Sequence, residues 1–342
     1  MSVRYTPIGF LPGDIEVNTH CIFTYGKKDD AFIRSVVEFL AAGINAREFC
    51  VCALDSPARD RVRDRMMQLG VDSDPNGRFS QFAIFGLKDV YYTPAGVFDT
   101  YHALKFWHEK LNIANQRWNG LRCFVEAGTV PLDRPSRLKL LEYEAILNIN
   151  FSANLAMCAY QSDVTSRSFF LQARKLHPYI ANVRSLRKNH DYVPSEKFFA
   201  GFYRYNRVSR TYGYSPGQLS VVQEDLENLA ARTPLRMSEI RDLKDSLAVV
   251  FGELLQQNVT NTSNLHIIFD SKPDKFAVIL SCRKDSICPQ SESLVDRISP
   301  HLMSCSLDEF HVKQKGDVFA VSLVKHISSA PWDDFGSRVR NP

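Results

Sequence analysis

The segment from Gly13 to Asp55 constrains the fold more than any other stretch of this chain. A short apolar strand, predicted from Cys21 to Thr24, is followed by a helix and then by a second apolar strand from Glu48 to Leu54. A strand, a helix and a second strand in this order are the opening of a βαβ unit, whose two strands run parallel in one sheet. The sequence therefore predicts an α/β sheet at the start of the chain.

The turn between the first strand and its helix lacks the composition of a phosphate-binding loop. It reads Tyr25-Gly26-Lys27-Lys28-Asp29-Asp30, with one glycine and with two acids where the helix begins. Acidic side chains at a helix N-terminus repel a phosphate group, which the helix dipole would otherwise attract. The turn thus favours a sensor or a scaffold over an ATPase, and we expect no cofactor.

Length and composition bound the number of domains and the class of protein. The chain has 342 residues, of which 44% are hydrophobic and 23% are charged. This length exceeds what one hydrophobic core usually organises, so we expect two domains. No apolar run approaches the about 20 residues that span a bilayer, and the N-terminus lacks the apolar region of a secretory signal. We therefore expect a cytoplasmic protein without a membrane partner.

The first half of the chain alternates between strands and helices, which is typical of a parallel sheet with helices on its faces. After the first two strands, apolar runs predict further strands at 81–85, 121–125 and 155–160, and an extended segment at 180–186. Helical periodicity predicts helices at 29–46, 55–69, 98–115, 135–148 and 166–176.

The pattern changes after residue 190. Residues 191–216 are rich in aromatic and basic side chains without helical period, and we interpret them as a linker. Helices predicted at 218–231 and 238–259 are then followed by two strands, a helix and two strands that end near His326, which is an α+β pattern. We expect the tail, residues 329–342, to be flexible.

Several segments of the first half, taken together, resemble the MEDS domain, a sensory module of bacterial and archaeal regulators that is related in fold to the RecA/KaiC-like ATPases. The matching segments include His20-Cys21-Ile22-Phe23, Asp55-Ser56-Pro57, Leu141 to Asn148, His177-Pro178 and Tyr192 to Glu196. The resemblance implies that residues 1–190 form a RecA/KaiC-like parallel sheet without a P-loop, that they sense a small molecule, and that an output domain follows.

The second half, residues 217–328, resembles a degenerate GHKL-type ATPase module of the anti-sigma regulator kind. Glu253 matches the glutamate of that family's metal-binding helix, but Gln257 stands where its asparagine belongs, and Asn258 is one position out of phase. One residue turns a helical side chain by about 100°. The adenine-binding turn, at 281–287, has no glycine. We therefore expect a degenerate ATP site that binds no nucleotide.

Ligands of an open parallel sheet bind beyond the carboxyl ends of its strands, which ranks the candidate residues by position. Tyr25, Asp55, Glu126 and Tyr160 each follow a predicted strand and are expected to supply hydroxyl and carboxylate groups to one crevice. Asp55 also suits the cap of its helix. Glu126 follows an apolar run, so a buried carboxylate in need of a partner is expected there.

Histidine and cysteine side chains are candidate metal ligands or catalytic groups. The cysteines on predicted strands include no Cys-x-x-Cys pair, so we interpret them as small core residues and expect no metal site. No His-x-x-x-His or Ser/His/Asp arrangement surrounds His20 or His177, so structural hydrogen bonds are expected for both and no catalytic residue is assigned. His20, at the start of the first strand, is also counted among the ligand-binding candidates.

The resemblances together imply a cytoplasmic signalling regulator. A MEDS-like sensor controls a non-catalytic output domain, which binds a sigma factor or its antagonist and is compatible with a homodimer. One alternative is an enzyme, a divergent ATP-dependent protein kinase in which Glu253 still organises Mg²⁺. A second is a transcription regulator that binds nucleic acid through the aromatic, basic residues 191–216. The net charge of +4 does not by itself require such a partner.

Overall fold

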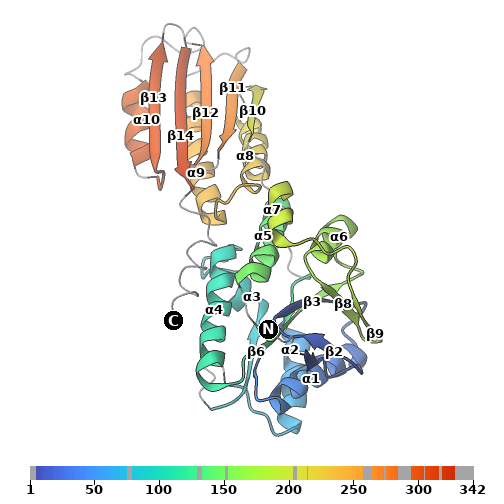
Figure 1. The fold of residues 1–342 in the computed structure, drawn as a ribbon. Helices are drawn as coiled ribbons and strands as arrows, with labels where there is room; N and C mark the ends of the chain where they lie inside the picture. The colour runs from blue at the N-terminus through green and yellow to red at the C-terminus, as the bar shows by residue number, and fades with distance from the viewer. Residues whose placement is uncertain are drawn as a thin grey trace. The chain divides into compact units, whose positions relative to one another are not determined.

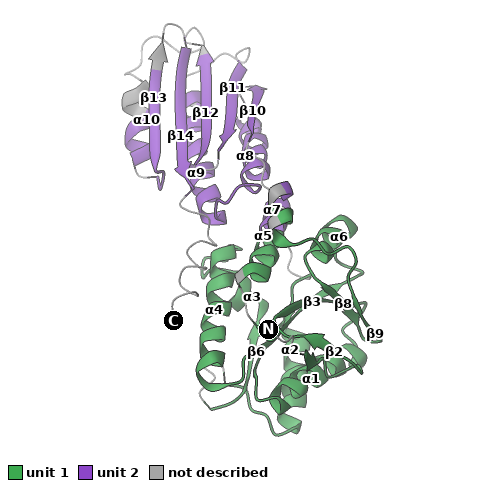
Figure 2. Cartoon of the chain, in the orientation of Figure 1, with its two compact units in different colours: residues 1–133, 140–200 green, residues 134–139, 201–342 purple. Residues whose placement is uncertain are grey.

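The computed structural model describes residues 5–74, 79–128, 133–150, 153–202, 206–213, 215–256, 264–272, 275–283, 294–303, 305–315 and 318–327. The chain divides into two compact units (Figure 2). Unit 1 consists of residues 1–133 and 140–200, and unit 2 of residues 134–139 and 201–342.

A seven-stranded sheet forms the centre of unit 1, in the order β5-β4-β6-β7-β3-β8-β9. Its strands are β3 (Thr19–Tyr25), β4 (Phe49–Leu54), β5 (Phe82–Gly86), β6 (Leu121–Glu126), β7 (Leu155–Gln161), β8 (Tyr179–Asn182) and β9 (Ser185–Lys188). All neighbouring strands run parallel except β8 and β9. The prediction of an α/β domain with a parallel sheet is confirmed.

Helices connect these strands (Figure 1). They are α1 (Asp30–Asn45), α2 (Ser56–Gln68), α3 (Leu87–Tyr91), α4 (Thr100–Arg117), α5 (Arg134–Asn150) and α6 (Arg167–Lys175). Asp55 caps α2, as expected, because its Oδ1 accepts a hydrogen bond from the Ala58 backbone nitrogen at 3.3 Å. The sequence did not predict α3 or the small N-terminal hairpin of β1 (Tyr5–Pro7) and β2 (Asp14–Glu16).

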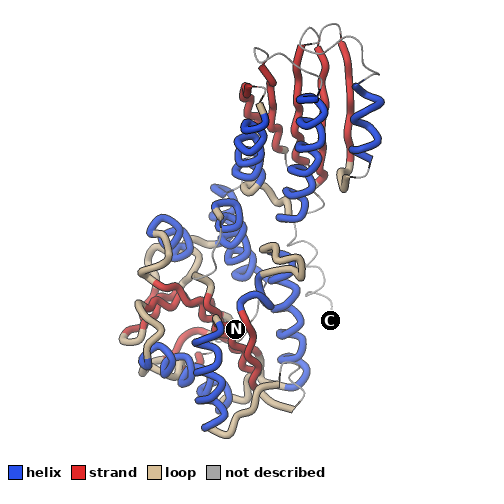
Figure 3. Tube along the Cα trace, turned by 180° about the vertical axis from the view of Figure 1, so that it is seen from behind, coloured by secondary structure: helices blue, strands red, loops and turns tan. Residues whose placement is uncertain are grey.

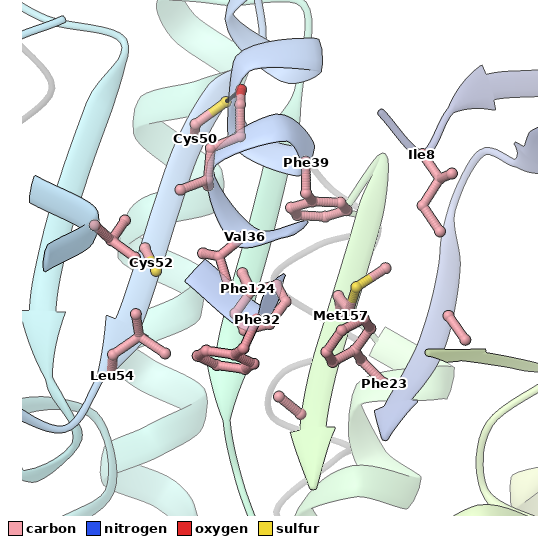
Figure 4. Close-up of a cluster of buried hydrophobic side chains, with 14 of the residues drawn as sticks. Ile8, Phe23, Phe32, Val36, Phe39, Cys50, Cys52, Leu54, Phe124 and Met157 are labelled. Carbon is pink, nitrogen blue, oxygen red and sulfur yellow. Dashed lines mark hydrogen bonds between the residues drawn. The ribbon is translucent and has the colours of Figure 1, made fainter. Parts of the chain in front are cut away.

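Side chains alternate across the sheet, so each strand of unit 1 contributes to two cores. The core on the side of α1 and α2 is built on aromatic rings (Figure 4). Phe23 packs against both Phe32 and Phe124, with ring centroids 6.2 and 5.7 Å away. Cys50 and Cys52 are buried in the same core, which confirms their interpretation as small core residues. Burial of each large side chain contributes about 1.5 to 3 kcal/mol.

Unit 2 contains a five-stranded sheet in the order β10-β11-β12-β14-β13, in which every neighbouring pair is antiparallel. Its elements are β10 (Arg207–Gly213), α8 (Pro216–Ala230), α9 (Met237–Gln256), β11 (Asn264–Ser271), β12 (Lys275–Arg283), α10 (Leu294–Met303), β13 (Glu309–Lys315) and β14 (Val318–His326). Helices α8, α9 and α10 cover one face of this sheet (Figure 3). The helix-then-sheet pattern predicted for this half is confirmed.

The segment expected to be a linker, residues 191–216, has regular structure of its own. It contains α7 (Ser195–Phe202) and β10, and β10 pairs with β11 along its whole length. Only Tyr212 of β10 is buried, so this strand shows little of the apolar alternation that identifies strands in a sequence. Residues 329–342, the predicted flexible tail, lie outside the described residues. No helix among the described residues has both the length and the apolar composition of a membrane span.

Candidate functional site

Three of the predicted site residues meet at the carboxyl ends of the strands. The Tyr25 hydroxyl donates a hydrogen bond to Glu126 Oε1 at 2.5 Å, and the Asp55 backbone nitrogen donates one to Glu126 Oε2 at 3.3 Å. Glu126 is fully buried. The expectation that its carboxylate is buried and partnered is therefore confirmed, and Tyr25 lies beside it as its position after a strand suggested.

Lys28 completes this group, which we call the strand-end cluster: Tyr25, Lys28, Asp55 and Glu126. Its Nζ forms ion pairs with Asp55 Oδ2 and, at 2.5 Å, with Glu126 Oε1. Burial lowers the pKa of Lys28, but hydrogen bonds to the two carboxylates outweigh burial, so the net shift of its pKa is upward. Burial and the charge of Glu126 together raise the pKa of Tyr25. Lys28 is not among the site residues predicted from the sequence, because a lysine in a turn that lacks the composition of a phosphate loop gives no indication of a partner.

A pocket of about 490 Å³ opens beside this cluster, at the carboxyl ends of β3, β7 and β8. Its lining combines charged, polar and apolar groups and consists of Thr24, Tyr25, Gly26, Lys27, Asp29, Ala31, Ser162, Asn182, Val183, Arg184 and Ser185. Strand β3 lies between β7 and β8, although the next strand of the chain, β4, lies on the far side of β6. The connections from β3 and β7 therefore leave in opposite directions, and such reversal points are where open α/β sheets bind ligands.

The expectation that Tyr160 shares one crevice with the other candidates is wrong. Ala159 of β7 is in register with Glu126 of β6, so the next residue, Tyr160, faces the opposite side of the sheet. The Tyr160 hydroxyl donates a hydrogen bond to Glu144 Oε1 at 2.9 Å. His20 lies in the same place, with its Nε2 3.1 Å from Glu144 Oε2. The five candidates therefore form two separate groups.

The second group is a buried cluster of His20, Glu144, Cys158 and His177, which we call the interior cluster. His20 Nε2 lies 2.7 Å from Cys158 Sγ, and Glu144 Oε2 lies 3.5 Å from both Cys158 Sγ and His177 Nε2. Each of these side chains is at most 5% exposed. His20 and His177 do contact a buried acid, as structural histidines would, but the sequence did not identify Glu144 as that acid.

The charges of the interior cluster are coupled. Burial alone would raise the pKa of Glu144, but the adjacent His20 and His177 outweigh burial and hold that pKa well below its usual range. Burial and the neighbouring His177 lower the pKa of His20. Burial raises the pKa of the Cys158 thiol, and the charge of Glu144 raises it further. The two histidines therefore favour the charged form of Glu144 against the cost of its burial.

The degenerate ATP site predicted in the second half falls only partly within the described residues. Glu253 lies in the last turn of α9, and its Oε1 is 4.0 Å from His301 Nε2. Gln257 and Asn258 lie outside the described residues. The expected loss of nucleotide binding therefore stays a prediction.

Comparison with known proteins bears on unit 1. Residues 19–178 match the family model of the MEDS domain, described as "MEthanogen/methylotroph, DcmR Sensory domain". No curated protein matches the chain. The crystal structure of B204, the DNA-packaging ATPase from Sulfolobus Turreted Icosahedral Virus, is similar at 10% identity, with 75% of this chain and 93% of that chain covered and a TM-score of 0.32. That score is too low to support an argument. The family match supports the MEDS part of the resemblance: residues 19–178 of this chain are similar to the MEDS sensory domain.

Proposed function

We propose that this chain is a signalling regulator whose MEDS unit binds a small molecule in the pocket beside the strand-end cluster. The match to a sensory family is the observation that carries the proposal. The position of the pocket supports it, because the pocket lies at the carboxyl ends of parallel strands where the chain reverses direction. Its volume suits a metabolite-sized ligand.

The lining of the pocket favours a small polar ligand that carries a negative charge. Lys27 and Arg184 bring two cationic side chains to it, both exposed. Asp29 brings one carboxylate, whose Oδ1 already accepts the 3.0 Å hydrogen bond from the Phe32 backbone nitrogen that caps α1. A ligand carboxylate between the two cations would form charge-assisted hydrogen bonds.

Tyr25 offers a physical route from the pocket into the interior of unit 1. It lines the pocket, and its hydroxyl donates to the buried carboxylate of Glu126. A ligand that contacts Tyr25 therefore acts on a charge cluster that also holds the start of α2 through Asp55. Such a ligand shifts the protein between two states only by its difference in affinity for them.

Unit 2 is proposed as the output module, in the form of a GHKL-like domain without ATPase activity. It would act by binding a protein partner, a sigma factor or its antagonist, and needs no catalytic residue. Its single-sided arrangement, with three helices on one face of an antiparallel sheet, supports this α+β assignment. RecA/KaiC-like ancestry is likewise proposed for the parallel sheet of unit 1.

Calorimetric titration of the full chain with a panel of small carboxylates tests the ligand site. We expect one or more members to bind, and Arg184→Ala to weaken that binding at least tenfold. Arg187→Ala is the matched control, because Arg187 is equally exposed on β9 but does not line the pocket. Binding that is lost equally in both variants, or unchanged in Arg184→Ala, contradicts this site. Hydrogen exchange in β11 and β12 with and without the ligand then tests the coupling, which fails if no amide of unit 2 responds.

A further inference from the structure

We propose that the interior cluster of unit 1 is a zinc site, in which His20, Glu144, Cys158 and His177 bind one Zn²⁺ ion. These residues come from four different elements: β3, α5, β7 and the turn between α6 and β8. Their positions in the sequence share no short spacing, which is why no metal motif is visible there. The fold alone brings them together.

The distances between the four donor atoms fit a single ion. One ligand atom from each side chain lies within 4.8 Å of all the others. Ligands held about 2.0 to 2.3 Å from a tetrahedral Zn²⁺ lie about 3.3 to 3.8 Å from one another. Glu144 Oε2 is 3.5 Å from both Cys158 Sγ and His177 Nε2, and 3.1 Å from His20 Nε2. Small side-chain shifts bring these atoms to the edges of a tetrahedron.

The orientation of His177 is the strongest single indication of a ligand. Its Nδ1 lies 2.8 Å from the Ala173 carbonyl oxygen and donates its proton there, so Nε2 is the ring nitrogen that faces the other three donors. That Nε2 is buried, 3.5 Å from Glu144 Oε2. A metal ion bound between this nitrogen and the carboxylate would pair both groups inside the core.

The groups around these donors resemble the outer shell of a metal site. The Tyr160 hydroxyl donates to Glu144 Oε1, which fixes the carboxylate and leaves Oε2 directed at the other donors. The Ala173 carbonyl fixes His177 in the same manner. Metal-bound histidines and carboxylates are usually held by such second partners.

The donor set favours Zn²⁺ over other ions. Two imidazoles, one carboxylate and one thiolate combine the nitrogen, oxygen and sulfur ligands that zinc accepts in a tetrahedral site, whereas Mg²⁺ and Ca²⁺ require oxygen ligands. One carboxylate and one thiolate also balance the charge of a divalent ion, so the site is neutral inside the core. All four ligands are protein side chains, and all are buried, so the site is of the closed, structural kind.

The zinc content of the purified full chain tests this proposal. We expect about one zinc per chain by inductively coupled plasma mass spectrometry. Cys158→Ala and Glu144→Gln should each lower the content at least tenfold. Cys123→Ala is the matched control, because Cys123 is as deeply buried on the neighbouring strand β6 but lies outside the cluster, and it should keep the zinc.

X-ray absorption of the zinc-loaded wild-type chain identifies the zinc ligands directly, whether or not the variants fold. The expected zinc shell has one sulfur at about 2.3 Å and nitrogen or oxygen ligands at about 2.0 to 2.2 Å. A shell with no sulfur or with several sulfurs overturns the proposal, and so does a soluble, zinc-loaded Cys158→Ala variant. A wild-type chain that contains no zinc and binds none when Zn²⁺ is added also overturns it. In that case the four residues form only a hydrogen-bonded core.

Discussion

Replacing Lys28 should lower the free energy of unfolding, because Lys28 forms an ion pair with the buried carboxylate of Glu126. In Lys28→Met the carboxylate of Glu126 stays fully buried and loses its ion pair with the Lys28 ammonium. Loss of one partner of a buried ion pair costs about 3 to 5 kcal/mol. Glu126 keeps hydrogen bonds from Tyr25 and Asp55, and Lys28 is itself 20% exposed, so solvent screens the pair in part. We therefore expect a loss of about 2 to 3 kcal/mol in the free energy of unfolding.

A second substitution separates charge from packing. In the double variant Lys28→Met/Glu126→Gln the buried charge is gone, so about 1 kcal/mol or more should be recovered relative to Lys28→Met alone. Lys27→Met is the matched control, because Lys27 is exposed and it is Lys28, not Lys27, that forms the ion pairs with Asp55 and Glu126.

Urea unfolding followed by tryptophan fluorescence measures these differences within unit 1 when all variants carry Trp332→Phe, which removes the one tryptophan of the chain outside that unit. Trp107 and Trp118 lie on α4 and at its end, so their emission reports this unit. The reasoning is refuted if Lys28→Met costs no more than Lys27→Met. It is also refuted if the double variant is no more stable than Lys28→Met, because the buried charge would then not be the cause.

Three further predictions concern the core of unit 1. Burial and the neighbouring carboxylate raise the pKa of Tyr25, so the contribution of its hydroxyl to stability is present below about pH 10 and is lost as the pH rises further. The urea midpoint of the wild-type chain should therefore fall between about pH 9 and pH 11, and Tyr25→Phe should flatten that fall. Gly43→Ala should lower the thermal midpoint by overpacking, at a cost of about 1 to 3 kcal/mol, because the new Cβ would lie 2.5 Å from Cys50 Sγ and 2.6 Å from Arg122 Cδ. Arg122→Met should lower the free energy of unfolding in urea by about 3 to 5 kcal/mol, because the Glu48 carboxylate would lose the Arg122 guanidinium, whose Nε lies 2.5 Å from Glu48 Oε2. A change near zero would show that this ion pair does not stabilise the fold.

The sequence predicted three of the four residues of the strand-end cluster because position along a strand is a local property. Tyr25, Asp55 and Glu126 each follow an apolar run, and parallel strands bring such ends to one edge of the sheet. Tyr160 also follows such a run, but the two faces of a sheet alternate at every residue, so its side depends on a register that one sequence does not reveal.

The interior cluster was beyond prediction for a different reason. Glu144 stands in a helix whose apolar neighbours, from Leu141 to Leu147, read as an ordinary buried face. The signal that was available is an acid at the centre of that face, since a buried carboxylate needs a partner. Its partners, however, come from β3, β7 and the turn after α6, and only the tertiary fold shows which histidines and cysteine they are.

The position of β3 in its sheet has a consequence for how the chain is made. The two neighbours of β3 are β7 and β8, while β4, the next strand to be synthesised, pairs with β5 and β6. Residues 26–154 must therefore emerge from the ribosome before β3 has any strand to pair with. At a synthesis rate of about 5 to 20 residues per second, β3 therefore remains without a partner strand for on the order of 10 s. The strands of this sheet therefore cannot pair one after another in the order of their synthesis, and a nascent chain that stops short of residue 155 leaves β3 without either of its neighbouring strands.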